Sequence, residues 1–381
     1  MPPPSLHAVS VQTTGEKGGA EYSNVDLMKG LAERGARVLL LTNFPEIADG
    51  SGVPVRRVDL GPKLSRRSVV RVAVGFLPWL VRLIRELRRA RAESGPIDVL
   101  LVHYKKEQLM AALVPRRLAR NVVWAEWGPV PFEFRRGLPR VLYVLAARRA
   151  ASIAAISEGT RESIEEVGVP GDKIEVIPNA IDVDRIRFDP DARERYRAEW
   201  GVDNGTFVMG SIARLHPKKR NDVLIEALRD LEGDVLLVIA GEGDDEQRLR
   251  ELAQVDEKRV RLLPTPRGYA GELLSAFDVA LFAPAPTEGA PRAIAMAQLA
   301  GRPVVATAPQ GAADMLVDNT GTVVAPPNDP RALARTLEDY RNDPERRRLE
   351  GERARAYAEV RYDRARVEDA FDRLIRDAAS S

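Results

Sequence analysis

The stretch Gly210–Arg220, GSIARLHPKKR, joins a β-branched run at Phe207–Ala213 to a helical pattern over Asn221–Leu231. A strand that passes through a short loop into a helix is the repeating unit of an α/β protein with a parallel sheet. Arg214 ends the strand and Lys219 begins the helix. Both therefore lie at the carboxyl edge, where open parallel sheets bind their ligands. Arginine and lysine together are a common pairing for a diphosphate, and a solvated basic loop is the alternative.

Alternation of strands and helices extends over both halves of the chain. The other expected strands are Val235–Ala240, Val260–Leu263, Val279–Phe282 and Pro303–Ala306 in the second half, and Ala8–Val11, Val38–Leu41, Val99–Val102, Val122–Trp124 and Ile153–Ile156 in the first. Helices are expected at Glu21–Arg34, Val69–Ala92, Leu138–Ala150 and, capped by Ser157, through Val167. The polar segment that follows Val176–Ile181, VIPNAI, indicates a linker between two Rossmann-like halves.

Length, composition and charge distribution exclude several classes of protein. A chain of 381 residues exceeds one ordinary core, and its lack of cysteine excludes disulfides, thiolate metal sites and a cysteine nucleophile. The first 180 residues hold 27 Lys and Arg against 19 Asp and Glu, whereas the remainder holds 31 against 37. The N-terminus shows no signal-peptide pattern, and no apolar run reaches the ~18–20 residues that span a bilayer. We therefore expect a cytoplasmic enzyme, and no basic-aromatic motif predicts nucleic-acid binding.

Two further loops carry chemistry. Thr13–Gly19, TTGEKGG, lies between a strand and a helix, where backbone N–H groups can approach an anion; a turn without a ligand is the alternative. Thr287–Gly301, TEGAPRAIAMAQLAG, follows the strand Val279–Phe282, and Glu288 there can accept hydroxyl groups of a sugar or cap the next helix. Gly241-Glu242-Gly243 lacks the third glycine of a dinucleotide fingerprint, which favours a surface turn.

Together these segments resemble the family-4 retaining glycosyltransferases of the GT-B fold over nearly the whole chain. The resemblance rests on GGAE at Gly18–Glu21, on RLxxxK at Arg214–Lys219, and on Glu288-Gly289 followed by AxxAGRPVVA at Ala297–Ala306. VIPNAID at Val176–Asp182 is similar to the interdomain segment of that family, and Gly311–Asp329 to its nucleotide-side loop.

The resemblance implies two Rossmann-like domains whose parallel sheets face a central cleft, with C-terminal helices. Residues 1–180 would bind the acceptor, residues 181–360 the sugar nucleotide, and the helix in 361–381 would pack back on the first domain. Arg214 and Lys219 would neutralise the leaving diphosphate, Gly18 and Gly19 would approach the donor phosphates, and Glu288 would bind the donor sugar. The amides near Gly289, Ala290 and Pro291 would frame that sugar, although Pro291 itself has no N–H. Transfer would retain the anomeric configuration, with no cofactor and no obligatory metal.

The chain departs from the family pattern at two places. Where the family has a second glutamate that holds the ribose hydroxyls, this sequence has Met296. A donor without a 2′-hydroxyl, such as a dTDP-sugar of natural-product biosynthesis, would explain the change, unless another residue compensates. The family also has a histidine after its mid-domain strand, and the nearest equivalents here are Glu126 and Trp127, with His103 after the preceding strand. These three residues are possible acceptor or sugar contacts, or they are structural.

The first domain also holds a basic amphipathic segment, Val69–Ala92. It would suit peripheral contact with the inner face of a membrane and a lipid-linked acceptor, or it packs its apolar stripe on the sheet. Asp182-x-Asp184 has the form of a metal-binding motif, but its place in the linker argues for chance. We expect a glycosyltransferase acting on a small-molecule or lipid acceptor. A phosphorylase or coupling enzyme of the same fold, or a non-catalytic binding protein, is the alternative.

Overall fold

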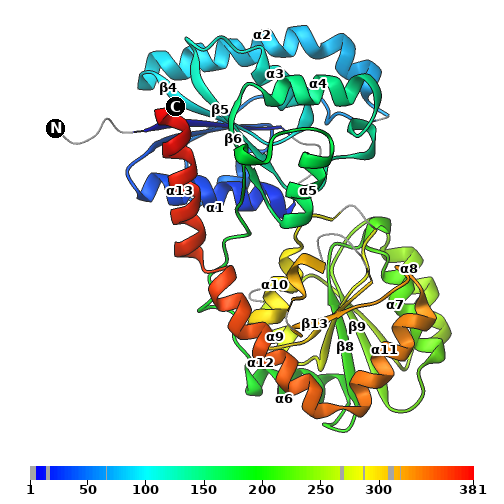
Figure 1. Cartoon of the computed structure of the whole chain (residues 1–381). Helices are drawn as coiled ribbons and strands as arrows, with labels where there is room; N and C mark the ends of the chain where they lie inside the picture. The colour runs from blue at the N-terminus through cyan, green and yellow to red at the C-terminus, as the bar shows by residue number, and fades with distance from the viewer. Residues whose placement is uncertain are drawn as a thin grey trace. The chain divides into compact units, whose positions relative to one another are not determined.

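The chain forms two compact units. The computed structural model describes residues 6–13, 18–65, 67–266, 270–285, 288–307, 313–317 and 319–381. Unit 1 comprises Met1–Ala180 and Ala365–Ser381, and unit 2 comprises Ile181–Arg364. Each unit is built on one sheet whose described strands all pair in parallel (Figure 1). The predicted α/β architecture of two parallel sheets is confirmed.

Unit 1 contains a seven-stranded sheet in the order β3-β2-β1-β4-β5-β6-β7. Its strands are β1 (His7–Gln12), β2 (Arg37–Thr42), β3 (Val55–Arg57), β4 (Ile97–Val102), β5 (Ala119–Glu126), β6 (Ala150–Ala155) and β7 (Ile174–Val176). Its helices are α1 (Gly19–Glu33), α2 (Val69–Ser94), α3 (Lys105–Ala112), α4 (Gly137–Ala147), α5 (Glu158–Glu166) and α13 (Arg364–Ser380).

The alternation of side chains along each strand separates the core of unit 1 into two layers. Val9 and Val11 of β1 pack with α2, α3 and α4, whereas Ala8 packs with α1 and α13. Figure 1 shows α2, α3 and α4 on one face of the sheet, and α1 and α13 on the other. The central strands β1 and β4 are buried along almost their whole length because helices cover both faces.

Unit 2 contains a six-stranded sheet in the order β10-β9-β8-β11-β12-β13. Its strands are β8 (Phe207–Ile212), β9 (Val235–Ala240), β10 (Val260–Leu263), β11 (Val279–Phe282), β12 (Val304–Ala306) and β13 (Gly321–Val323). Its helices are α6 (Pro190–Trp200), α7 (Asn221–Ala227), α8 (Glu246–Ala253), α9 (Ala270–Ser275), α10 (Arg292–Leu299), α11 (Pro330–Asn342) and α12 (Pro344–Arg361). Helices α7, α8 and α11 cover one face, and α9, α10 and α12 cover the other.

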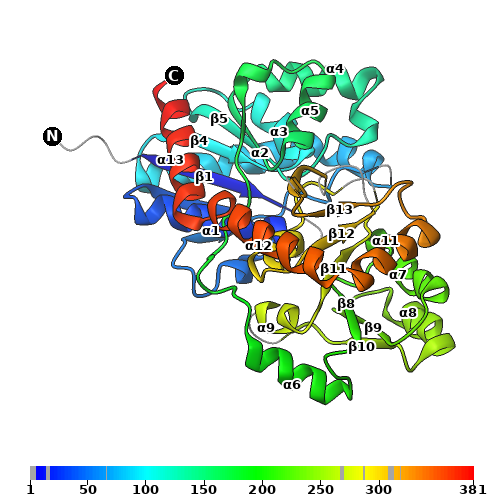
Figure 2. The same ribbon diagram turned by 60° about the horizontal axis from the view of Figure 1, so that its bottom comes forward.

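The last helix returns to unit 1. α12 packs in unit 2, where Ala354 and Ala358 are buried, and α13 then lies beside α1 in both ribbon views (Figure 1, Figure 2). Arg34, just after α1, donates to Glu368 at 2.8 Å and to Asp369 at 2.7 Å. Gly30 allows this close approach, because a Cβ there would collide with the side chain of Glu368.

The polar segment after the predicted linker forms a helix that the sequence pattern did not indicate. α6 begins after Asp189, whose carboxylate accepts a hydrogen bond from the Ala192 N–H at 3.0 Å. Six of its eleven residues are charged, so it offers little apolar periodicity. Its two aromatic side chains pack against the core of unit 2, and Arg193 and Arg197 reach the residue that precedes β11.

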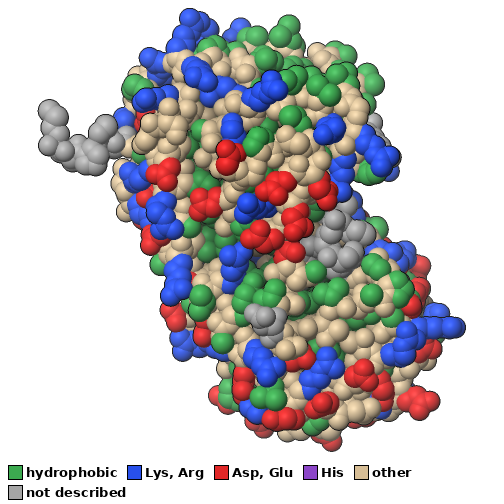
Figure 3. Space-filling model, viewed as in Figure 1, with side chains coloured by type: hydrophobic (Ala, Val, Ile, Leu, Met, Phe, Trp, Pro, Cys, Tyr) green, Lys and Arg blue, Asp and Glu red, His purple; other side chains and the backbone are tan. Residues whose placement is uncertain are grey.

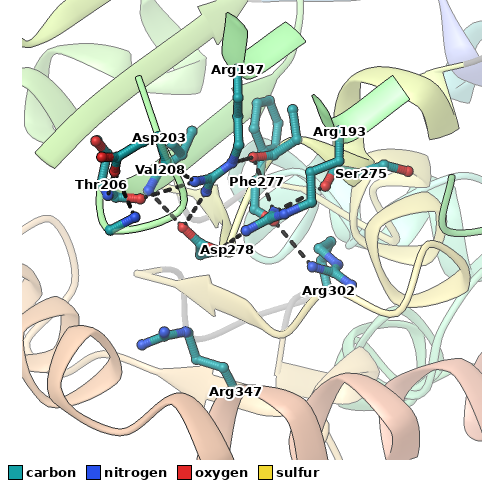
Figure 4. A network of polar contacts seen from close by, with 12 residues as sticks. Arg193, Arg197, Asp203, Thr206, Val208, Ser275, Phe277, Asp278, Arg302 and Arg347 are labelled. Atoms are coloured by element: carbon teal, nitrogen blue, oxygen red, sulfur yellow. Dashed lines mark hydrogen bonds and ion pairs between the residues drawn. The ribbon is translucent and has the colours of Figure 1, made fainter. Parts of the chain in front are cut away.

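That residue, Asp278, is the centre of a buried ion cluster (Figure 4). Its carboxylate receives Arg193 and Arg197 at 2.7 Å each, and also the backbone N–H of Val208 at 2.8 Å. The arginines also donate to backbone carbonyls of the turn before β11, as Arg302 does to Phe277 O at 3.2 Å. Burial lowers the pKa of Arg302 to about 10. The cluster fastens α6 to the amino edge of the sheet.

Candidate active site

The carboxyl edge of the sheet in unit 2 carries the charged side chains that the sequence singled out. β8 and β11 are neighbours in the middle of the sheet, and chain connections on either side of this pair run in opposite directions. Such a topological switch point is the general ligand site of an open parallel sheet. Arg214 and Lys219 follow β8, and Glu288 follows β11, so the three residues flank this point.

Lys219 and Glu288 form a direct ion pair. The Nζ atom of Lys219 lies 2.8 Å from Oε1 of Glu288, with side-chain exposures of 20% and 26%. Lys219 closes the short helix η4 (Pro217–Lys219), and its ammonium also lies 5.5 Å from the centroid of the Phe282 ring. The backbone N–H of Ala285 donates to Lys218 O at 2.7 Å and so joins the loop after β11 to η4. The pair is thus held from both strands and remains within reach of solvent.

The loop that carries Arg214 packs closely against two glycines. Leu215 N donates to Glu242 O at 2.8 Å, and Asp245 N donates to Leu215 O at 3.1 Å. A Cβ at Gly241 would collide with the carbonyl oxygen of Ala213, and one at Gly243 with that of Leu215. Residues 242–244 are exposed in a turn, as expected, and the two glycines let this turn approach the loop that carries Arg214. The sequence signal was the pair of glycines directly after a buried strand beside β8.

The residues after Glu288 lead into α10. Gly289 and Ala290 precede Pro291, which caps the helix with extended backbone (φ −64°, ψ 120°). Their peptide groups therefore lie at a helix N-terminus, the end with a favourable field for anions and polar ligand groups. Pro286 and Thr287 lie outside the described residues, as do Gly311, Ala312 and Asp318 of the expected nucleotide-side loop.

Met296 lies one turn further along α10 and is half-buried. It lines a small apolar gap between α10 and the sheet, together with Ile212 and Phe282. The other lining residues are also apolar: Gly210, Leu274, Ala280, Leu281, Ala293, Ile294, Ala297 and Val304. Most of them are buried in the core of unit 2, so Met296 packs on that core at the position where the family pattern has a glutamate.

In unit 1 the glycine-rich turn is described only in part. Gly18 is the N-cap of α1 and Gly19 is exposed at its first turn, whereas Thr14–Lys17 lie outside the described residues. Glu21 of the GGAE segment is buried and accepts a hydrogen bond from the Tyr104 hydroxyl. The role of Gly18 and Gly19 toward donor phosphates stays a prediction.

His103 is enclosed in a hydrogen-bond chain at the carboxyl edge of this sheet. Its Nδ1 accepts from Trp127 Nε1 at 3.0 Å, so Nε2 carries the proton and donates to Ser10 Oγ at 2.8 Å. Ser10 is in turn bonded to Asn24 of α1. The ring is 2% exposed, and burial lowers the pKa of His103 to about 3. Both ring nitrogens are bound by the protein itself, which indicates a structural role for His103.

Glu126 is enclosed as well. Its carboxylate accepts from Lys105 Nζ at 2.6 Å, from Gln108 at 2.9 Å and from the Tyr143 hydroxyl at 2.8 Å. Burial lowers the pKa of Lys105, which the charge of Glu126 opposes, and burial beside Glu126 raises the pKa of Tyr143. With Glu126 4% exposed, the residue available to a ligand among the three candidates is the half-buried Trp127, which stacks on His103 at 5.9 Å.

Sequence reasoning missed the cluster that holds Glu126. α3 begins with Lys105-Lys106-Glu107-Gln108, and all four side chains are buried. Lys106 donates to Gly61 O at 2.8 Å and lies 3.5 Å from Glu107. Four polar residues directly after a central strand were the available signal, but charged residues in a helix are normally solvated, so the pattern predicts a surface.

Neither a metal-binding cluster nor a membrane-spanning helix occurs in the described part of the chain. Within it, His, Asp and Glu nowhere gather in a group of three that could hold a metal ion. Asp182 and Asp184 instead pair with Arg185 at 3.2 Å and Arg187 at 2.8 Å. Among the same residues, every helix is too short or too polar to pass through a bilayer.

Two Rossmann-like units, with a lysine–glutamate pair and an arginine at the switch point of the second, define a glycosyltransferase of the GT-B fold. Residues 17–185 match Glycosyltransferase Family 4, and residues 192–357 match Glycosyl transferases group 1. The chain belongs to this family of glycosyltransferases, which use sugar-nucleotide donors, as the sequence resemblance predicted.

Individual relatives agree with this assignment. The chain is 27% identical over 372 residues to the 2-deoxystreptamine glucosyltransferase of Streptomyces kanamyceticus, covering 91% of this chain and 93% of the relative. It is 30% identical over 270 residues to the GDP-mannose-dependent alpha-(1-6)-phosphatidylinositol monomannoside mannosyltransferase of Mycolicibacterium smegmatis, covering 66% and 68%. The crystal structure of Anabaena HepE in complex with UDP superposes with a TM-score of 0.80 at 22% identity, covering 96% and 98%. The last similarity establishes the fold.

Proposed function

We propose that this protein transfers a sugar from a nucleoside-diphosphate donor to a hydroxyl of a small-molecule acceptor, with retention of the anomeric configuration. The observation that carries the proposal is the convergence of Arg214, Lys219 and Glu288 at the switch point of unit 2. The positive groups come from one strand connection and the carboxylate from its neighbour, and Lys219 and Glu288 are in contact.

Arg214 and Lys219 would act on the leaving group. Cleavage of the bond between the sugar and the diphosphate leaves negative charge on the phosphate oxygen. Fixed positive charges that are already in place stabilise that charge without reorganisation, which is the largest contribution a protein usually makes to such a reaction. Because Arg214 and Lys219 would supply the positive charge, the proposal does not require a metal ion or another cofactor.

Glu288 would divide its interactions between Lys219 and the donor. One carboxylate oxygen accepts from Lys219 at 2.8 Å, and the second can accept hydroxyl groups of the donor sugar. The ion pair thus holds Glu288 in position for the sugar and Lys219 in position for the diphosphate. In this proposal the acceptor hydroxyl attacks from the face of the leaving group, and a phosphate oxygen of the donor takes its proton.

The nucleotide is proposed to lack a 2′-hydroxyl, as in a dTDP-sugar. The support is Met296 itself, because its side chain offers no carboxylate to two ribose hydroxyls at the position where the family pattern has a glutamate. For the acceptor we propose an aminocyclitol or a related natural-product polyol, because the relative from Streptomyces kanamyceticus acts on 2-deoxystreptamine. A lipid-linked acceptor is the second candidate, because the Mycolicibacterium smegmatis relative acts on a phosphatidylinositol mannoside.

The test is release of nucleoside diphosphate from dTDP-, UDP- and GDP-sugars by the purified chain, with and without 2-deoxystreptamine. We expect acceptor-dependent release, fastest with a dTDP-sugar, and a product whose anomeric proton coupling matches that of the donor. Inversion of the anomeric centre would refute the retaining mechanism. Turnover only with inorganic phosphate would identify a phosphorylase, and binding without turnover of any donor would identify a non-catalytic relative.

A further inference from the structure

Helix α2 carries two apolar stripes, and only one of them is buried. Val72, Leu80, Leu83 and Leu87 pack into unit 1. A second stripe, at a spacing of four, three and four residues, lies on the exposed side and therefore forms one continuous line along the helix. Its members are Val70, Val74, Leu77 and Val81, with exposed fractions of 74%, 78%, 67% and 42%. The sequence predicted the packed stripe but did not separate it from the exposed one.

Helix α4 repeats this arrangement. Tyr143, Ala146 and Ala147 face the core, while the opposite side is apolar and exposed. That side consists of Leu138, Val141, Leu142 and Leu145, with exposed fractions of 68%, 51%, 44% and 48%. Phe132, in the short helix η2 (Phe132–Phe134) before α4, is 63% exposed as well.

The two helices lie on the same face of the sheet. Both pack against α3, and the same core layer receives their buried stripes (Figure 1). Of the 15 large hydrophobic side chains exposed in the described structure, 11 fall within residues 69–145. Figure 3 shows hydrophobic side chains interspersed with Lys and Arg over this part of unit 1. Such a concentration of exposed apolar groups indicates an interaction surface.

The two stretches of sequence that carry these stripes are basic and contain no acidic residue. The sequence contains no Asp or Glu between Asp59 and Glu86, and none between Glu133 and Glu158. Exposed arginines are interspersed through the first interval and through α4 and its flanks. They are Arg67, Arg71, Arg82 and Arg85 in the first, and Arg136, Arg140 and Arg148 in the second. An apolar surface interspersed with basic side chains, with no acid in either interval, is complementary to a surface that combines hydrocarbon with negative charge.

We propose that the exposed stripes of α2 and α4, with their arginines, form a docking surface for an anionic lipid bilayer. The apolar side chains would enter the interface between headgroups and acyl chains, and the arginines would bind lipid phosphates. A second copy of the chain is a poor fit, because the same acid-free surface would be brought against itself. This inference stands apart from the proposed function, because lipid binding is measured without donor or acceptor.

The test is co-sedimentation of the full chain with vesicles of phosphatidylcholine alone or with added phosphatidylglycerol. We expect binding only to the anionic vesicles, decreasing as salt screens the arginines. The double variant Val74→Ser/Leu77→Ser should weaken binding roughly tenfold, in line with the loss of one buried aliphatic side chain or more. Arg71→Gln/Arg140→Gln should weaken binding at low salt and make it less dependent on salt, because fewer charges remain to be screened. These residues are exposed, so thermal unfolding should be unchanged.

The matched control is Val255→Ser, which removes a valine that is 71% exposed in unit 2 and should leave vesicle binding unaltered. Absence of sedimentation with anionic vesicles at low salt would overturn the proposal, as would an equal loss in the control. A change from dimer to monomer in the Val74→Ser/Leu77→Ser variant would show instead that a second copy occupies the surface. Nucleotide-sugar turnover without vesicles reports separately on the proposed function.

Discussion

Unit 2 pairs basic side chains with a carboxylate at both edges of the same sheet, and the two arrangements differ in how completely they are satisfied. At the amino edge Asp278 is 12% exposed, and its arginines also bind backbone carbonyls. At the carboxyl edge Lys219 and Glu288 form one contact and stay about a fifth to a quarter exposed. The same combination of basic side chains and a carboxylate therefore forms a buried structural cluster at the amino edge. At the carboxyl edge it forms a partly exposed pair that a ligand can reach.

The largest effect is expected from Asp278→Asn. A buried pair that loses one partner leaves uncompensated charge, which costs about 3 to 5 kcal/mol of unfolding free energy. Arg193 and Arg197 would both be left in this state. Native-state hydrogen exchange of the amides of β8 and β11 would measure the loss within unit 2. Asp184→Asn is the control, because its pair with Arg187 is exposed and should contribute less than about 1 kcal/mol.

The next largest effect is expected from Lys219→Ala, at the carboxyl edge of the same sheet. Removal of one charge that stabilises the leaving group should reduce kcat/KM by about 10²- to 10³-fold, or roughly 3 to 4 kcal/mol in the transition state. Thermal stability should change little, because the pair with Glu288 is partly exposed. The neighbouring Lys218→Ala removes the same charge one residue away and should alter turnover by only a few-fold. Equal losses in both variants would mean that general positive potential matters rather than the position of Lys219.

In unit 1 the enclosed His103 should make stability depend on pH. The unfolded chain protonates this ring below about 6.5, whereas the folded chain does so only near 3. The unfolded state therefore binds more protons than the folded state in that pH range. The free energy of unfolding falls as the pH decreases through it, by about 1.4 kcal/mol per pH unit below 6.5. His103→Gln keeps an acceptor for Trp127 and a donor for Ser10. It should lessen the loss of stability between neutral pH and about pH 5 by roughly 2 kcal/mol. Urea denaturation at several pH values would show this, and an unchanged pH dependence would contradict it.

The smallest effect is expected from Met296→Glu, which restores the carboxylate of the family pattern. A new hydrogen bond from ribose hydroxyls to a charged acceptor should favour UDP over dTDP by about tenfold, or ~1.4 kcal/mol. Calorimetry with both nucleotides measures this ratio. Met296→Gln is the matched control for the charge. If the wild type already prefers UDP, another residue holds the ribose and the proposed role of Met296 is wrong.

Most of the central strands and three residues of the candidate site could be predicted from short stretches of the sequence. The strands at Val235–Ala240, Val260–Leu263 and Val279–Phe282 have the bounds expected from their buried apolar runs. Shorter edge strands such as β3 and β13, and the polar helix α6, lack that periodicity and were missed. Arg214, Lys219 and Glu288 could be placed because each lies in the connection that follows a predictable strand, and parallel strands end at one edge of a sheet.

The sequence by itself therefore determined the alternation of strands and helices, the family and the three charged residues at the switch point. Only the tertiary structure decided which polar groups are already satisfied. His103 meets Ser10 across 93 residues, Glu126 meets Lys105 across 21, and Gly243 abuts Leu215. These contacts depend on strand order and on helix placement, which no local pattern encodes. Burial then fixes whether a charge is structural or free to act on a ligand, because the cost of an unpaired polar group depends on its access to water.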